Sequence, residues 1–352
     1  MDMTDDRLLE PLGLLSGPAA ADAVRLGVAR WLCGGPAAFT LARLWRGYRD
    51  MGLVRVDALP PGWDDVLARV CAPLGAAGLP DGARVMGIVN VTPDSFSDGG
   101  RHLVVDHAVA AAVDMLAQGA VFLDIGGEST RPGAARVTPA QEWDRIAPVI
   151  TALRNDARTC NAVISVDTRH ALVMGHALAA GVDAINDVSA LMHDPAAAAV
   201  VAHAGCPVML MHMRGTPETM NDHATYTDVA VDVVRELRER IDHAVAAGVA
   251  RGRIMVDPGI GFAKTAAQNM ELLARLPLLA NLGCRVVLGV SRKRFVGQVT
   301  GVADAASRDP GSMAASLPGL VFANTILRVH DTGTMMQGLK IWQGLDCTQQ
   351  VR

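Results

Sequence analysis

The sequence predicts a (β/α)8 barrel, the TIM-barrel fold, preceded by an N-terminal extension. Eight short apolar, β-branched segments follow one another along the chain, and each interval between them leaves room for one helix. The whole array takes roughly 250 residues, the usual length of such a barrel. A doubly wound open sheet is the alternative, but it does not usually need eight evenly spaced parallel strands. We expect an extension packed on the barrel (1–83), the barrel (84–345) and a C-terminal tail (346–352).

The predicted strands are mostly apolar at consecutive positions, as expected for parallel strands that are covered on both faces. Aromatic residues make up only 4% of the chain, so the core must be built from Ala, Val, Leu, Ile and Met. The predicted strands are 84–90, 120–126, 162–167, 182–187, 206–212, 253–259, 284–291 and 324–331.

Helix signals occupy the intervals between these strands. Thr138 and Gln141 fit a capping box, in which two side chains cap the first turn of a helix, and Thr265 with Gln268 repeats the pattern. Pro318 interrupts the seventh helical segment, because proline removes a backbone donor and clashes with the preceding turn. We therefore expect a short or kinked helix there.

Composition and charge exclude several classes of function. Half of the 352 residues are apolar and 19% are charged, which is typical of globular proteins. A net charge of −4 without any basic run predicts no nucleic-acid partner. The acidic start and the lack of a long apolar segment predict no signal peptide and no membrane span. The six cysteines are scattered without a C-x-x-C pair, which favours reduced thiols in a cytoplasmic protein and argues against structural zinc.

Every predicted strand ends in a group that can form hydrogen bonds or carry charge. In a (β/α)8 barrel the C-terminal ends of the strands meet at one face, where the active site lies. The set is rich in carboxylates and cations, which predicts a site for a polar, ring-shaped, partly anionic ligand. Its members are Asn90, Asp124, Asp167, Asn186, Asp187, His212, Asp257, Ser291, Arg328 and His330.

Residue types narrow the chemistry of this site. Arg328 and His330 are two apart on a strand and point to the same side, so with Thr130 and Arg131 they could bind a phosphate or pyrophosphate. Asn90 offers an amide oxygen that suits one protein ligand to Mg²⁺. The short carboxylates and amides at the other strand ends, Asp167, Asn186 and Asp257, pair well with the N–H donors of a heterocycle.

Eight motifs occur together in the chain. They are "MGIVNVTPDSFSDGG", "DIGGESTRPGA", "ISVDT", "AINDVSAL", "LMHMRGTPETM", "VDPGIGFAK", "VSRKRFVG" and "RVHD". With these motifs in this order, the sequence resembles the dihydropteroate synthases of the folate pathway, which are (β/α)8 enzymes. The resemblance covers about residues 84–340, and its first two motifs are too long for an accidental match.

The resemblance implies an enzyme that joins 7,8-dihydropterin-6-ylmethyl pyrophosphate to 4-aminobenzoate, releasing pyrophosphate and giving 7,8-dihydropteroate. An electron-rich pterin can stabilise a methylene cation as pyrophosphate departs, and the arylamine then attacks that carbon. Catalysis is therefore expected to come mainly from electrostatic preorganisation around the leaving group. The residues that the resemblance assigns to the pterin and to catalysis are Asp167, Asp257, Lys293 and Arg328, with Asn186 and Met211 as further pterin contacts.

The leaving group and the second substrate are assigned by the same resemblance. Mg²⁺ would bridge Asn90 and the pyrophosphate, and Phe262 would either line the approach of 4-aminobenzoate or only cap the barrel. Phe96 lies among the turn formers of "NVTPDSFSDGG" and is predicted to be a lid residue that packs over the second substrate. The residues expected to bind pyrophosphate are Thr130, Arg131, Arg328 and His330.

Simpler interpretations stay open for individual residues. Asp257 precedes a Pro-Gly pair and could form a turn, and Asn186 could make local turn bonds. Met211 could serve packing alone. His212 is interpreted as a core histidine with satisfied nitrogens, and Lys264 could be a solvated charge at a helix start.

Other features bear on assembly and on rival functions. The resemblance implies a homodimer and a sulfonamide target, but Pro318 and the pair Ala323–Asn324 depart from the family's usual pattern near its dimer contact. Residues 1–83 show no site chemistry, so they are either a packing extension or a surface for a partner. The rival functions are a pterin-binding methyltransferase, which has no use for a pyrophosphate site, and a non-catalytic pterin-binding homologue.

Overall fold

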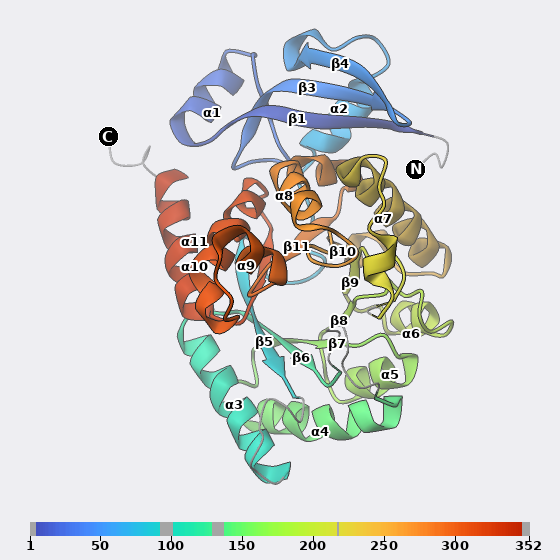
Figure 1. Ribbon diagram of the computed structural model, residues 1–352, viewed down its shortest axis with the longest axis vertical. Helices are drawn as coiled ribbons and strands as arrows, with labels where there is room; N and C mark the ends of the chain where they lie inside the picture. Colours follow the sequence, from blue (N-terminus) through green and yellow to red (C-terminus); the bar gives the residue numbers. More distant parts are fainter. Residues whose placement is uncertain (1–4, 92–100, 129–136, 217, 347–352) are drawn as a thin grey trace.

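The computed structural model describes residues 5–91, 101–128, 137–216 and 218–346. They form a closed barrel of eight parallel strands surrounded by helices, with a small antiparallel sheet from the N-terminal part of the chain lying against one side (Figure 1). The barrel closes because β12 pairs with β5, where Ile326 lies opposite Arg84. The predicted (β/α)8 barrel with an N-terminal extension is confirmed.

All eight predicted strands are present, each slightly shorter than or equal to its apolar segment. Their apolar side chains are almost entirely buried, which agrees with coverage on both faces. The strands are β5 (Arg84–Asn90), β6 (Phe122–Gly126), β7 (Val163–Asp167), β8 (Ala184–Asp187), β9 (Val208–Met211), β10 (Ile254–Asp257), β11 (Arg285–Gly289) and β12 (Ile326–Val329).

The helices begin and end where local chemistry predicts. Both capping boxes form, with the backbone N–H groups of Gln141 and Gln268 donating to the hydroxyls of Thr138 and Thr265. The interrupted segment is α10, which ends before Pro318 and continues as a 3-10 helix, η7 (Leu317–Val321). The outer helices are α3 (Arg101–Ala117), α4 (Pro139–Asn155), α5 (Ala171–Ala179), α6 (Ala197–Ala204), α7 (Val229–Ala246), α8 (Ala266–Ala274), α9 (Arg294–Thr300), α10 (Asp309–Ser316) and α11 (Thr332–Asp346).

A buried arginine closes the N-terminal end of the barrel. The Arg285 guanidinium donates to the carbonyls of Ala76 (3.2 Å), Gly82 (3.0 Å) and Asn324, and it lies 5.7 Å from the ring centre of Phe122. Burial lowers the pKa of Arg285 to about 10. The chain segment that precedes the first barrel strand is thus fixed across the barrel's base, opposite the face where the site is expected.

The extension is an antiparallel sheet with two helices. Its strand β3 pairs with β1, β2 and β4. Its other elements lie around this sheet and against the barrel (Figure 1). The elements are β1 (Arg7–Leu15), α1 (Gly17–Arg25), β2 (Arg30–Trp31), β3 (Ala38–Arg46), β4 (Arg49–Arg55) and α2 (Asp64–Cys71).

Polar contacts join β1 to the barrel next to η5 (Leu276–Leu282). The buried Glu10 accepts from Arg275 (2.6 and 3.0 Å) and from the Trp45 indole (2.9 Å). The buried Asn281 amide pairs with both backbone groups of Leu9, at 3.0 and 2.8 Å. The extension therefore docks through satisfied buried polar groups as well as apolar packing.

Two further expectations concern cysteines and membrane spans. The five described cysteines are free, and three of them, Cys33, Cys206 and Cys284, are buried. Within the described part of the chain, no helix has both the length and the apolar character required to cross a bilayer.

We predict that Asn281→Ala destabilises the protein by about 2–3 kcal/mol, because it leaves the N–H and C=O of Leu9 buried without partners. Urea unfolding of the purified variant measures this loss. The matched control Asn161→Ala removes an exposed amide and should change stability by less than about 0.5 kcal/mol. Equal stability of the two variants would show that the Asn281 bonds do not hold the extension.

Candidate active site

Strand register places three of the polar strand ends and one glycine in a row at the mouth of the barrel. Asn90 lies opposite Gly126, Gly126 opposite Asp167, and Asp167 opposite Asn186. A β-carbon on Gly126 would lie 3.7 Å from both the Asn90 Oδ1 atom and the Asp167 β-carbon. Because Gly126 has no side chain, the space between Asn90 and Asp167 stays open.

Arg328 crosses the mouth and joins two carboxylates from neighbouring strands. Its Nε donates to Asp124 Oδ2 (2.6 Å) and its terminal nitrogen donates to Asp167 Oδ2 (2.7 Å). Asp124 is fully buried and also accepts from the Asn186 amide (2.9 Å) and the Ser165 hydroxyl. Asp124 is therefore the centre of a network that holds Arg328 and Asn186 in fixed orientations.

Burial and charge act in opposite directions on these groups. Burial raises the pKa of Asp167, the Arg328 guanidinium opposes the rise, and the carboxylates Asp124 and Asp187 add to it. For Arg328, burial lowers the pKa, but the carboxylates of Asp124 and Asp167 outweigh it and hold the pKa above its ordinary value. The 2.7 Å bond between Arg328 and Asp167 thus joins a guanidinium to a carboxylate that is costly to ionise without it.

A second group of polar side chains faces this network across β11. A β-carbon on Gly289 would lie 3.5 Å from Asp257 Oδ2 and 3.9 Å from Arg328 Cδ, so Asp257 and Arg328 border the same open space. Burial raises the pKa of Asp257, and Lys293 is the foremost opposing charge. Burial lowers the pKa of Lys293 to about 8. The Lys293 ammonium lies 4.6 Å from the ring centre of Phe262 and donates to the Ile260 carbonyl.

Some of the remaining predicted residues lie at the barrel mouth, and the others lie outside the described part of the chain. Met211 is buried at the end of β9, opposite Asp257 in the strand pairing, and His330 pairs its Nδ1 with the Ser291 hydroxyl at 3.0 Å. The structure thus brings Asn90, Asp167, Asn186, Met211, Asp257, Phe262, Lys293, Arg328 and His330 to one end of the barrel. Phe96, Thr130 and Arg131 lie outside the described residues.

His212 and Lys264 form a supporting network beside the site. His212 is 3% exposed, with its Nδ1 3.0 Å from Lys264 Nζ and its Nε2 3.0 Å from Glu236 Oε2. Its interpretation as a satisfied core histidine is confirmed. The alternative that Lys264 is a solvated charge at a helix start is wrong, because its Nζ lies among one ring nitrogen and two backbone carbonyls.

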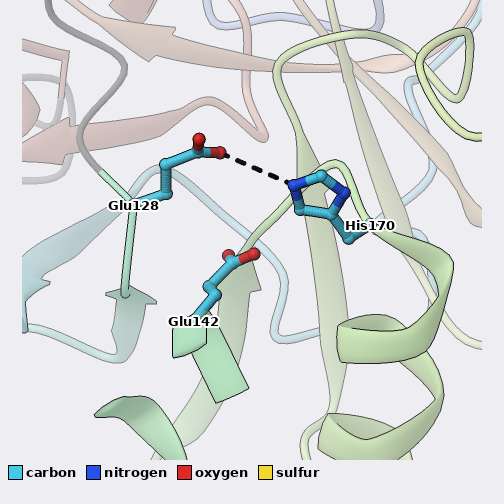
Figure 2. Close-up of side chains that lie close together, drawn as sticks. All are labelled: Glu128, Glu142 and His170. Atoms are coloured by element: carbon cyan, nitrogen blue, oxygen red, sulfur yellow. Dashed lines mark ion pairs between the residues drawn. The ribbon is translucent and has the colours of Figure 1, made fainter. Parts of the chain in front are cut away.

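Two glutamates and a histidine converge behind the row of strand ends (Figure 2). The ligand atoms of Glu128, Glu142 and His170 lie within 4.8 Å of one another. Neither Glu142 oxygen has a hydrogen-bond partner, and Glu142 is fully buried. Arg169 donates to the Glu128 carboxylate at 3.0 and 3.2 Å, so the charge of Glu128 is already balanced by a guanidinium.

The surroundings of Glu142 favour the protonated form of its carboxyl group. Burial raises the pKa of Glu142 to about 8, and the charges of Glu128 and Asp167 add to this rise. Burial also lowers the pKa of His170, which leaves its imidazole neutral near pH 7. We therefore interpret this cluster as a structural support for the strand ends, in which Arg169 balances Glu128 and a proton balances Glu142.

A separate cavity of about 420 Å³ lies among the segments that follow β7, β8 and β9. Its lining includes Arg169, His193, Arg214 and Arg240. None of the predicted site residues that the structure describes lines this cavity. Arg214 is already paired with Glu236 and Asp232, so part of its positive charge is used within the protein.

Sequence reasoning missed three residues that the structure places in or behind the site. Asp124 is one of the polar strand ends, but the sequence assigns no role to it. Its place at the end of a predicted strand is the same signal that indicates Asp167. Glu142 follows a capping box and looks like an ordinary charge in a first helical turn. The role of Arg169 depends on its contact with Glu128, which no local pattern indicates.

The fold and the site define the class of protein: a (β/α)8-barrel enzyme with its polar side chains gathered at the C-terminal ends of the strands. Residues 86–330 match the family described as "Pterin binding enzyme", and the chain belongs to that family.

Several of its curated relatives are named dihydropteroate synthase. The protein from Neisseria meningitidis serogroup C is 44% identical, over 75% of this chain and 93% of its own, and the protein from Escherichia coli K12 is 40% identical, over 73% and 89%. Among solved structures, the Xanthomonas albilineans enzyme with 4-aminobenzoic acid has 46% identity and a TM-score of 0.70, covering 76% of this chain and 94% of its own. The same enzyme with 7,8-dihydropteroate has 43% identity and a TM-score of 0.69, covering 78% and 98%.

We predict that Glu142→Gln removes a pH dependence of stability. The pKa of Glu142 is about 8 in the fold against 4.5 for the ordinary side chain, so the folded protein binds one more proton between these values. The contribution of Glu142 to the free energy of unfolding should therefore be greatest below about pH 4.5. It should fall by up to about 1.4 kcal/mol per pH unit until about pH 8.

Urea unfolding at pH 5.5 and pH 8.5 measures this difference. Glu142→Gln should lose less stability between the two pH values than wild type does, whereas the exposed control Glu239→Gln should behave like wild type. An unchanged pH dependence in Glu142→Gln would contradict the assignment of a proton to this carboxyl.

Proposed function

We infer that the chain is a dihydropteroate synthase, which condenses 7,8-dihydropterin-6-ylmethyl pyrophosphate with 4-aminobenzoate and releases pyrophosphate. The observation that carries this inference is the convergence of Arg328, Asp167 and Asp257 around open space at the barrel mouth. Support comes from the family match over residues 86–330 and from relatives that align with 73–75% of this chain and have this activity in their names.

The pterin would be recognised by hydrogen bonds from the strand ends. Asp257 keeps Oδ1 on the Gly259 N–H (2.7 Å), which leaves Oδ2 toward the open space beside Gly289. A carboxylate in this position can accept from the N–H donors of a pterin edge. Lys293 can donate to the ring carbonyl or a ring nitrogen, and Met211 would cover one face of the ring. These roles are proposals that rest on placement and on the resemblance.

Departure of pyrophosphate needs positive charge at a fixed position. Arg328 is oriented by Asp124 and Asp167, so little reorganisation is needed when negative charge develops on the leaving group. His330 lies two residues beyond Arg328, just past the end of β12, and its Nδ1 is 3.0 Å from the hydroxyl of Ser291, which follows β11. We propose that Arg328 and His330 bind the pyrophosphate together with Thr130 and Arg131.

Magnesium is proposed as the cofactor, with Asn90 as its protein ligand. The Asn90 Oδ1 atom lies at the mouth beside Gly126, and an amide oxygen is the hard type of ligand that this ion prefers. One protein ligand fits an ion whose other positions are taken by water and by substrate oxygens. Bound there, the ion would supply further positive charge to the leaving group.

The second substrate and the assembly complete the proposal. We propose that 4-aminobenzoate approaches beside Phe262 under the predicted lid residue Phe96, and that the chain forms a homodimer. Pro318 is the second residue of η7, which follows α10 directly, so the surface formed there differs from that of an unbroken helix. Sedimentation equilibrium of the purified protein would measure the oligomeric state.

Turnover assays test the proposed reaction directly. Purified protein with dihydropterin pyrophosphate, 4-aminobenzoate and Mg²⁺ should yield dihydropteroate and pyrophosphate in equal amounts. Asp167→Asn and Arg328→Ala should each lower turnover by at least about 10²–10³, because each removes a preorganised charge, while the circular dichroism spectrum stays unchanged. The control Arg158→Ala removes an exposed arginine and should keep full activity. Absence of both products with wild type, or near-normal turnover in either site variant, would contradict the proposal.

A further inference from the structure

We propose that Lys264 is a positioning residue of the pterin site, which ties the segment between β10 and α8 (258–265) to the end of β9. This inference rests on the proposed function, because it concerns how the same site holds its pterin. Lys264 acts through the backbone of the β10–α8 segment and through His212, and it does not touch the reacting atoms.

The Lys264 ammonium has one acceptor for each of its three protons. Its Nζ lies 3.0 Å from His212 Nδ1, 3.0 Å from the Gly259 carbonyl and 3.0 Å from the Phe262 carbonyl. An ammonium group carries three donors and no acceptor, so this set satisfies it completely. The two carbonyls belong to the β10–α8 segment, and the imidazole follows β9, so one side chain joins two neighbouring strand ends.

The proton positions around His212 follow from these contacts. Because Nδ1 accepts from Lys264, the imidazole proton lies on Nε2 and is donated to Glu236 at 3.0 Å. Burial and the charge of Lys264 lower the pKa of His212 to about 4, so the ring is neutral. Glu236 has a pKa of about 2: burial would raise it, but bonds from His212 and Arg214 outweigh that effect. The imidazole that accepts from Lys264 is thus itself fixed by Glu236.

The β10–α8 segment needs such a tie because its backbone is unusual. Gly259 has φ +66°, and a β-carbon there would lie 1.8 Å from the His212 carbonyl oxygen. Ala263 also adopts a left-handed φ, 50°, which is unfavourable for a residue with a side chain. The Tyr226 hydroxyl supports Ala263 by donating to its carbonyl at 3.0 Å. External bonds of this kind keep an otherwise strained path in a single conformation.

The β10–α8 segment in turn holds the groups that face the pterin. The Gly259 N–H donates to Asp257 Oδ1 at 2.7 Å, which orients the carboxylate. The Ile260 carbonyl accepts from Lys293, and the Phe262 ring lies beneath the same ammonium. Lys264 anchors the carbonyls of Gly259 and Phe262, on either side of Ile260. Loss of its three bonds would therefore let Asp257, Phe262 and Lys293 move together.

Charges from every neighbouring element act on Lys264. Removal from water lowers its pKa to about 7, and Lys293 after β11 and Arg214 after β9 add to the fall. Asp257 on β10 and Glu236 on α7 oppose it. The two carboxylates thus favour the charged form that the three-acceptor arrangement requires.

Pterin binding tests this role without turnover. Lys264→Met keeps much of the side-chain volume but has no donor, and Lys264→Gln restores part of the donor capacity. Titration calorimetry with 6-hydroxymethyl-7,8-dihydropterin should show a loss of affinity of about tenfold or more in the Met variant and a smaller loss in the Gln variant. In turnover assays the KM for dihydropterin pyrophosphate should rise by a similar factor and by more than kcat falls. The exposed control Lys340→Met should match wild type in both measurements.

Other outcomes would overturn the inference. Pterin affinity within about twofold of wild type in folded Lys264→Met would do so, as would a lower melting temperature with unchanged affinity and KM. If Lys264→Met does not fold, the comparison rests on Lys264→Gln, and wild-type affinity in that variant would equally overturn it. Failure of the wild-type protein to bind the pterin would instead contradict the proposed function.

Discussion

The site depends on one interaction: the Arg328 guanidinium is held between the carboxylates of Asp124 and Asp167. These residues come from β12, β6 and β7, so their contact requires the closed barrel in which β12 pairs with β5. A charged group that is mostly removed from water is stable only when it is paired, and breaking such a pair typically costs 3–5 kcal/mol. The pairing therefore fixes Arg328 across the mouth, and its guanidinium opposes the rise that burial causes in the pKa of Asp167.

Glycines and secondary supports complete the arrangement around that interaction. Gly126 and Gly289 leave space beside the carboxylates, where a side chain would otherwise fill the mouth. On one side, Arg169 with Glu128 and the protonated Glu142 stabilises the ends of β6 and β7. On the other side, the network of His212, Lys264 and Glu236 stabilises the end of β10. The polar groups that face the substrate are thus held in place, because the residues beside them have hydrogen-bond and ion-pair partners of their own.

The barrel could be predicted from the sequence because consecutive apolar runs, capping boxes and polar strand ends are all local signals. The fold of the extension could not be predicted, because strands such as β3 contain Ala and Arg without a clear alternation. The closure of the barrel base by Arg285 depends on three distant carbonyls, and no local pattern indicates it. The buried contacts of Lys264 could not be predicted either, because a lysine at a helix start is usually exposed. In each of these cases the missing information is long-range contact.

A double-mutant cycle on Asp124 and Arg328 tests the central claim most directly. Asp124 is expected to serve the site by holding Arg328. In a protein that already carries Arg328→Gln, the further change Asp124→Asn should therefore alter kcat/KM little. The account predicts that each single variant loses at least about 100-fold and that the double variant is close to the worse single variant. Losses that multiply in the double variant would show that the two residues act independently and would contradict the account.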